Sequence, residues 1–191
     1  MARERKFTKE ELYRVTEELL LTYNYEGFQI SLVADHLNVS RGAIYKYYEN
    51  KEELITEYML FKMEQFLQEL EEINNIIGFQ SKFDFLMTIM FKNPELYQLI
   101  EIGKSVPIHI NVKVKEGIEK LDGYRIEMYE YAHSFIEAGK SEKLLNPKIP
   151  DSVMLGYIFQ SVVIPNHFNI PHDVWVQSIK DLICHGIFID S

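Results

Sequence analysis

The sequence has 191 residues, of which 47% are hydrophobic and 26% are charged, and its net charge at pH 7 is −9. This composition is typical of a folded chain with a sizeable core and argues against a disordered protein. No apolar run approaches the ~18 residues that a membrane span needs, the charged N-terminus does not resemble a signal peptide, and the single cysteine, Cys184, excludes an intrachain disulfide. We therefore expect a cytoplasmic protein.

The acidic charge is unevenly distributed along the chain. Residues 1–51 carry eight Lys and Arg against eight Asp and Glu, so the later residues carry the whole net charge. The basic residues of this first segment cluster at the extreme N-terminus and around residues 41–51. Because charges more than ~10 Å away are largely screened, this segment can still bind phosphate on an acidic protein.

The first predicted helix covers residues 8–23. Thr8 is followed three residues later by Glu11, which is the spacing of a capping box at a helix start. Gly27 is expected to end this element.

Two short helices are predicted next, over 30–37 and 41–48. Apolar residues recur in the first at helical spacing, which predicts one buried face, formed by Ile30, Val33, Ala34 and Leu37. Asn38 tolerates the left-handed conformation of a tight turn, and Ser40 is expected to cap the second helix. The pair is a helix-turn-helix, in which the second helix reads the major groove of DNA.

Longer helices are predicted in the middle of the chain. A capping box of Asn50 and Glu53 opens a helix over 51–74, and an apolar segment over 81–92 is expected to be buried. Asn93-Pro94 is expected to start a short helix that ends near Ile102. Residues 108–114 alternate as a strand does, but no partner strand exists, so we expect an irregular or helical segment.

The remaining predicted helices cover 116–138, 151–164 and 172–188. Gly139 is expected to stop the first of these, and prolines separate the others. The predicted fold class is therefore all-α, with an N-terminal three-helix head followed by a larger helical domain.

Candidate DNA contacts lie on and around the second helix of the pair. Arg is the residue that most often reads guanine, and small residues let a helix approach the bases closely. Hydroxyl and ammonium groups one turn later can bind phosphates, as can a lysine at the next helix N-terminus. The candidates are Ser31, Ser40, Arg41, Gly42, Ala43, Tyr45, Lys46, Tyr47 and Lys51. Simple packing is the alternative for the tyrosines, and we expect it for Tyr48.

These residues resemble the TetR family of bacterial transcriptional regulators. The similarity covers about residues 8–56 and rests on Gly27-Phe28, the run from Val33 to Tyr48, and Asn50-Lys51-Glu52-Glu53-Leu54. The resemblance implies a DNA-binding domain over 1–50 and a ligand-binding and dimerisation domain over 51–191. It further implies a homodimer on a palindromic double-stranded operator, a repressor that a small and largely apolar effector releases, and an interface built from the last two helices. The candidates there, for interface or core, are Val153, Tyr157, Phe159, Val162, Trp175, Ile179 and Leu182.

An effector pocket is expected where helices are apolar on more than one face, although core packing is the alternative for each residue. Tyr129 and His133 are candidates to orient a ligand, and a metal site of His133 with Glu137 is less expected than an ordinary side-chain pair. The full set of ligand candidates is Phe83, Met87, Met90, Tyr97, Tyr129 and His133.

An enzyme and a helical adaptor are the two alternatives to a regulator. The chain has none of the short motifs of metalloproteases, P-loop enzymes, serine hydrolases or dinucleotide-binding enzymes, so we expect no catalysis, no cofactor and no metal. The second alternative is a helical adaptor or ligand-binding protein that does not act on DNA.

Overall fold

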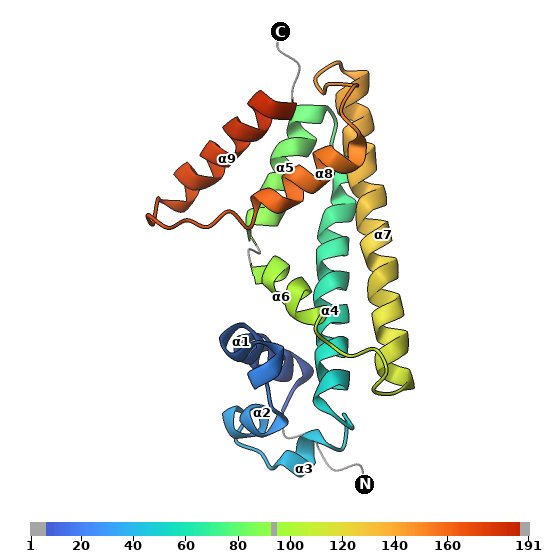
Figure 1. The fold of residues 1–191 in the computed structure, drawn as a ribbon, viewed down its shortest axis with the longest axis vertical. Helices are drawn as coiled ribbons and strands as arrows, with labels where there is room; N and C mark the ends of the chain where they lie inside the picture. Colours follow the sequence, from blue (N-terminus) through green and yellow to red (C-terminus); the bar gives the residue numbers. More distant parts are fainter. Residues whose placement is uncertain (1–6, 93–94, 188–191) are drawn as a thin grey trace. The chain divides into compact units, whose positions relative to one another are not determined.

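The computed structural model describes residues 7–92 and 95–187, and within them the chain is helical, with no strand (Figure 1). The expected all-α fold is confirmed. The elements in chain order are α1 (Lys9–Gly27), α2 (Ile30–His36), α3 (Arg41–Ile44), α4 (Lys51–Glu71), the 3-10 helix η1 (Glu72–Asn75), α5 (Phe79–Lys92), α6 (Glu95–Gly103), α7 (Val112–Ser141), α8 (Asp151–Ser161) and α9 (His172–Ile187).

The residues divide into two compact units. The first unit is formed by residues 1–65 and 95–124, and the second by residues 66–94 and 125–191. Helices α4 and α7 contribute residues to both. The boundary expected at residue 50 separates a DNA-binding domain from a ligand-binding and dimerisation domain, and it stays a prediction.

The start of α1 is the capping box that the sequence predicts. The Thr8 hydroxyl accepts a hydrogen bond from the Glu11 amide at 3.1 Å, and the Glu11 carboxylate accepts one from the Thr8 amide at 2.8 Å. The helix continues past the expected end at residue 23, across a kink at Asn24, whose φ is 54°. Asparagine is one of the few residues that adopt this left-handed conformation readily.

The first unit is held together by a buried apolar cluster. Helix α1 packs against α2 and α6, and α2 packs against α3. Asn93-Pro94, where the sequence predicts the start of α6, lies outside the described residues. The largest side chains that are fully buried in this unit are those of Tyr58, Phe28, Leu12, Leu19, Leu20, Ile44, Leu54 and Ile55.

Helix α7 begins before and ends after its predicted bounds of 116 and 138. It starts at Val112 because the Asn111 side chain caps it, accepting a hydrogen bond from the Val114 amide at 3.0 Å. Residues 108–111 before it are irregular, as expected. Gly139 does not stop the helix, which was expected to end there. A Cβ at Gly139 would lie 2.6 Å from side chains of Leu145 and Phe79, so this glycine allows close packing instead.

The second unit has an aromatic core. Phe79 and Phe83 of α5 stack with Phe135 of α7, with ring centroids 4.8 to 6.2 Å apart. Helix α5 packs against α9, and Lys180 donates a hydrogen bond to Asp84 at 2.7 Å across this contact. α8 ends at Ser161, before the predicted 164, and residue 188 of the last predicted helix lies outside the described residues. No helix among the described residues is both long and apolar enough to span a membrane.

Candidate nucleic-acid interface

The segment from α2 to α3 forms the expected helix-turn-helix. Asn38 has a φ of 52°, the left-handed conformation that the turn was predicted to need. The turn is closed by the amide of Val39, which donates to the carbonyl of Ala34 at 2.9 Å. The chain direction therefore reverses within a few residues and α3 packs against α2.

The buried face of this motif leaves the opposite face of α3 to solvent. Ile30, Val33 and Ala34 of α2 are buried together with Ile44 of α3, as the apolar spacing predicts. Tyr48 is also buried, which confirms its packing role. Because these groups all face the core of the unit, Arg41 and Gly42 of α3 are left exposed, while Ala43 packs partly against the core.

Most of the predicted DNA contacts are exposed. The side chains of Tyr45 and Tyr47 are 51% and 43% accessible, although Tyr47 packs edge-on against Phe7 with ring centroids 6.0 Å apart. Sequence reasoning did not identify this contact, because nothing local links residue 7 to residue 47. The exposed candidates on this face are Ser40, Arg41, Gly42, Tyr45, Lys46 and Tyr47.

Two candidates are less accessible. Ala43 is half-buried. Ser31 is also half-buried, and its hydroxyl donates to the side-chain oxygen of Gln29 at 3.2 Å. Ser31 can still accept a hydrogen bond, and its contact with DNA stays a prediction.

Helix α3 is shorter than predicted. It covers Arg41–Ile44 instead of 41–48, and residues 45–47 continue as hydrogen-bonded turns. The Tyr47 amide donates to the carbonyl of Ile44 at 2.9 Å, the three-residue spacing of a turn, and the Tyr48 amide donates to the same carbonyl at 3.2 Å. Ser40 occupies the N-cap position, but its hydroxyl makes no capping hydrogen bond, contrary to expectation. The helix therefore does not use that hydroxyl.

Among the described residues, no packing contact requires a glycine at position 42. A Cβ built on it meets only the Ser40 hydroxyl oxygen, at 4.0 Å. Because Gly42 has no side chain, the exposed face of α3 is flat at this position, which suits the predicted close approach to DNA.

The exposed face of residues 40–47 carries two cations, Arg41 and Lys46. Among the described residues, neither Arg41 nor Lys46 has an ion-pair partner. The neighbouring acids Glu52 and Glu53 are buried. Glu52 accepts a hydrogen bond from the Tyr25 hydroxyl at 2.8 Å. Burial and this hydrogen bond raise the pKa of Tyr25 to about 12. The carboxylates of Glu52 and Glu53 are therefore held inside the protein, whereas Glu49, just before them, is exposed and lies 3.5 Å from Lys113.

Lys51 differs from the other basic candidates because its ammonium is used inside the protein. It donates to the carbonyls of Tyr25 and Phe28 at 2.8 and 3.3 Å. An ammonium has three N–H donors, so one remains for a phosphate. A phosphate contact by Lys51 therefore stays a prediction. Its observed role is structural, because it bonds to two backbone carbonyls.

The ligand candidates occupy different environments. Phe83, Met87 and Met90 are buried in the core of the second unit, whereas Tyr97 belongs to the first unit. Tyr129 is exposed and packs edge-on against Phe159, with ring centroids 5.9 Å apart.

His133 is also exposed, and its Nε2 lies 3.2 Å from Asp151 Oδ2. Its Nδ1 lies 3.8 Å from Glu137, the ordinary side-chain pair that the spacing suggests. No group of three or more His, Cys, Asp or Glu suited to a metal occurs in the described part of the chain.

An all-α chain whose first helices form this motif, with an exposed and locally basic second helix, has the architecture of a helix-turn-helix DNA-binding protein. Residues 12–58 match the family described as bacterial regulatory proteins, tetR family. The chain is also similar to the fatty acid metabolism regulator protein of Bacillus subtilis (strain 168), with 24% identity over 153 residues that cover 76% of each chain.

Solved structures show the same fold. The ketosteroid transcriptional regulator KstR2 of Mycobacterium tuberculosis superposes with a TM-score of 0.74 and 12% identity, over 100% of this chain and 98% of that chain. The transcriptional regulator FadR from Bacillus subtilis in complex with stearoyl-CoA has a TM-score of 0.69 and 18% identity, over 94% of this chain and 100% of that chain. The N-terminal segment thus matches the tetR family of bacterial regulatory proteins, and the chain as a whole has the fold of these solved structures.

Proposed function

We propose that the protein is a homodimeric repressor that binds a palindromic operator and leaves it when a largely apolar effector binds. Residues 1–50 supply the reading head, and residues 51–191 supply effector binding and dimerisation. The protein acts on DNA in the cytoplasm and catalyses no reaction. The observation that carries the proposal is the exposed surface of residues 40–47, which presents Arg41 and Lys46, neither with an ion-pair partner among the described residues, together with the small Gly42.

The dimer interface is proposed on α8 and α9. Exposed apolar side chains recur at helical spacing on both helices, at Val153 and Tyr157 of α8 and at Val174 and Leu182 of α9. Soluble monomers rarely expose apolar groups in such a pattern, and an interface between two copies would cover them. The other predicted residues, Phe159, Val162, Trp175 and Ile179, are half-buried or buried and support these helices from within.

The effector is proposed to contain a fatty acyl chain. One similar protein is named for fatty acid metabolism and one similar structure holds stearoyl-CoA. The second unit offers flexible and aromatic side chains that suit an acyl chain, including Met87, Met90 and Phe83. Because these three are buried, effector binding requires them to move apart. Tyr129 and His133 are the polar groups proposed to orient the ligand.

The experiment is an in vitro selection of operator sequences from a random DNA library, followed by anisotropy titrations. A regulator should select a palindrome, and its affinity for that DNA should fall steeply with salt. Stearoyl-CoA should release the DNA at concentrations where coenzyme A alone has no effect. A protein that selects no sequence would be an adaptor, and selection without release by stearoyl-CoA would contradict the effector class alone.

A further inference from the structure

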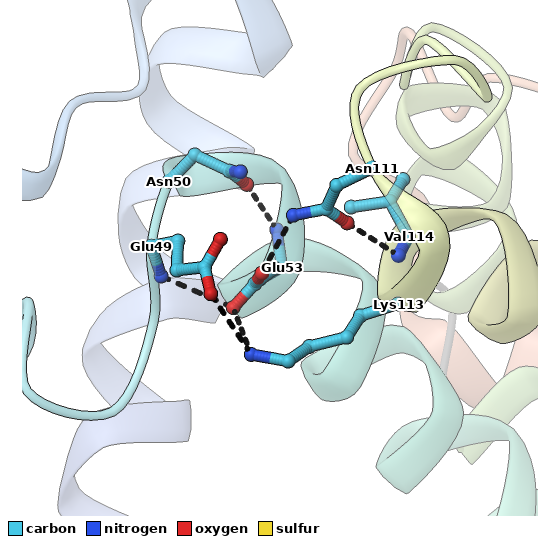
Figure 2. Close-up of polar contacts among 6 residues, drawn as sticks. All are labelled: Glu49, Asn50, Glu53, Asn111, Lys113 and Val114. Atoms are coloured by element: carbon cyan, nitrogen blue, oxygen red, sulfur yellow. Dashed lines mark hydrogen bonds and ion pairs between the residues drawn. The ribbon is translucent and has the colours of Figure 1, made fainter.

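A buried carboxylate joins the connection after α3 to the start of α7. Figure 2 shows Glu53, in the first turn of α4, surrounded by side chains and backbone from both segments. Its side chain is only 5% exposed. A charge buried to this extent needs hydrogen-bond donors around it, and all of the donors found here come from the first unit.

Both oxygens of the Glu53 carboxylate accept hydrogen bonds. Oε1 accepts from Asn111 Nδ2 at 2.7 Å, and Oε2 accepts from the Glu49 amide at 3.1 Å. Lys113 Nζ lies 3.5 Å from the same Oε2 and 3.5 Å from Glu49 (Figure 2). The Glu53 charge is the main reason that the pKa of Lys113 is raised.

Two asparagines that bond to Glu53 also cap helices. Asn111 uses its other side-chain atom, Oδ1, to cap α7 at Val114. Asn50 Oδ1 accepts from the Glu53 amide at 2.8 Å and so caps α4. Glu49 comes directly after Tyr48, at the end of the turns over residues 45–47 that follow α3. The Glu53 carboxylate therefore links the residues that follow α3 with the start of α4 and the start of α7.

We propose that Glu53 is a positioning residue for DNA binding, which holds the α3–α4 connection against α7 in the arrangement that places α3 on the operator. This inference rests on the proposed function. Glu53 itself does not touch DNA. Removing its charge leaves the DNA contacts in place but reduces the fraction of the protein in the binding-competent arrangement, and apparent affinity falls by that fraction.

The test substitution is Glu53→Gln. A glutamine has one acceptor oxygen and two N–H donors, so it must face at least one of the present donors with a donor of its own. We expect operator affinity to fall on the order of tenfold, the effect of losing one charge-assisted hydrogen bond. Sequence preference and the salt slope should stay as in the wild type, because no contact with base or phosphate is lost.

Glu64→Gln is the matched control. Glu64 also lies on α4, and it accepts hydrogen bonds from α7, from Lys120 at 2.9 Å and from Tyr124. The substitution makes the same change of net charge on the same pair of helices, but far from the α3–α4 connection in sequence. We expect its operator affinity to stay within about twofold of the wild type.

A charge swap provides the rescue. In the double variant Glu53→Gln with Asn111→Asp, the glutamine amide donates to the new carboxylate, and the glutamine oxygen accepts from the Glu49 amide. The new aspartate still caps α7, because Asp is as good an N-cap as Asn. Every donor is satisfied again, so we expect affinity to recover to within about threefold of the wild type.

Hydrogen exchange gives a second measurement that needs no DNA. The Glu49 amide should exchange faster in Glu53→Gln than in the wild type or in Glu64→Gln, because a neutral glutamine oxygen is a weaker acceptor than the carboxylate. Should Glu53→Gln fail to fold, Asn111→Ser serves instead. Serine retains a cap for α7 but is too short to reach Glu53, and a threefold to tenfold loss of affinity is expected.

Three results would overturn the inference. Glu53→Gln could bind the operator like the wild type, Glu64→Gln could weaken binding equally, or the charge swap could fail to restore binding. A wild-type protein that binds no DNA would instead disprove the proposed function, and the positioning role would fall with it.

Discussion

The ammonium of Lys51 lies 4.1 Å from the centre of the Tyr25 ring and donates a hydrogen bond to the carbonyl of the same residue. This contact ties the end of α1 to the start of α4, beside the reading helix. Lys51 and Lys46 are both basic residues proposed to contact DNA, yet only Lys51 has partners inside the protein among the described residues. Their substitutions should therefore have different effects.

We expect Lys51→Met to lower the free energy of unfolding by about 1–2 kcal/mol, because two carbonyls lose a charged donor. Lys46→Met should leave unfolding unchanged and should reduce the salt slope of DNA binding by about 0.9 per head, since only a phosphate contact is lost. Urea denaturation and anisotropy titrations at several salt concentrations measure both effects. If Lys51→Met unfolds like the wild type, the ammonium contributes little to the fold.

Arg41→Ala should cost about 1–3 kcal/mol of binding free energy at the selected operator and should relax the preference at one base pair of each half-site. The reason is the position of Arg41 at the exposed start of α3, without an ion-pair partner among the described residues. Arg14→Ala is the matched control, because Arg14 is an exposed arginine of the same unit that pairs with Glu18 at 3.7 Å. Equal losses for both variants would mean that only net charge matters.

Gly42→Ala should change stability and DNA binding in opposite directions. Alanine is favoured over glycine within a helix by about 0.5–1 kcal/mol, and the Cβ meets no atom closer than 4.0 Å. On DNA the added methyl group occupies the face that approaches the bases, so binding should weaken by about 1–3 kcal/mol. Thermal unfolding and operator titrations measure the two effects. Unchanged binding would show that α3 does not approach DNA closely at this position.

Leu182→Glu should convert the proposed dimer into a monomer without unfolding the chain, because this side chain on α9 is 61% exposed within one chain. Binding to the palindromic operator should weaken in parallel, since two heads must bind two half-sites. Light scattering after size-exclusion chromatography reports the assembly. Leu144→Glu, an exposed leucine outside α8 and α9, is the control and should remain dimeric. A Leu182→Glu dimer would place the interface elsewhere.

Asp151 should stabilise the second unit in a pH-dependent way. Its carboxylate accepts a hydrogen bond from Lys140 and lies beside His133, and these partners lower its pKa below the usual 3.8. A lowered folded-state pKa means that the unfolded chain binds the proton first as pH falls. The stability that Asp151 contributes is therefore present above about pH 4 and disappears as pH falls through the folded-state pKa.

The comparison for this prediction is Asp151→Asn, followed by urea denaturation between about pH 7 and pH 3. The difference in unfolding free energy between wild type and variant should be largest at neutral pH and should shrink in acid. A difference that does not change with pH would mean that the carboxylate charge is not what stabilises this contact.

The sequence by itself determined the class of fold and the position of the reading head. The capping box of Thr8 with Glu11, the apolar spacing of α2 and the left-handed turn at Asn38 all depend on residues a few positions apart. Such signals act within one helix or one turn, so they do not depend on how the helices pack against one another. The exposed face of α3 follows from them directly.

Only the tertiary structure decided the roles that depend on distant residues. Lys51 binds carbonyls 23 and 26 positions earlier, and Glu53 binds Asn111, 58 positions later. Gly139, which reads as a helix stop, lies inside α7 because Phe79 packs against it. A helix can place such groups on a given face, but which partner meets that face depends on how the helices pack. That packing is decided by the buried cores of the two units, and no local spacing encodes it.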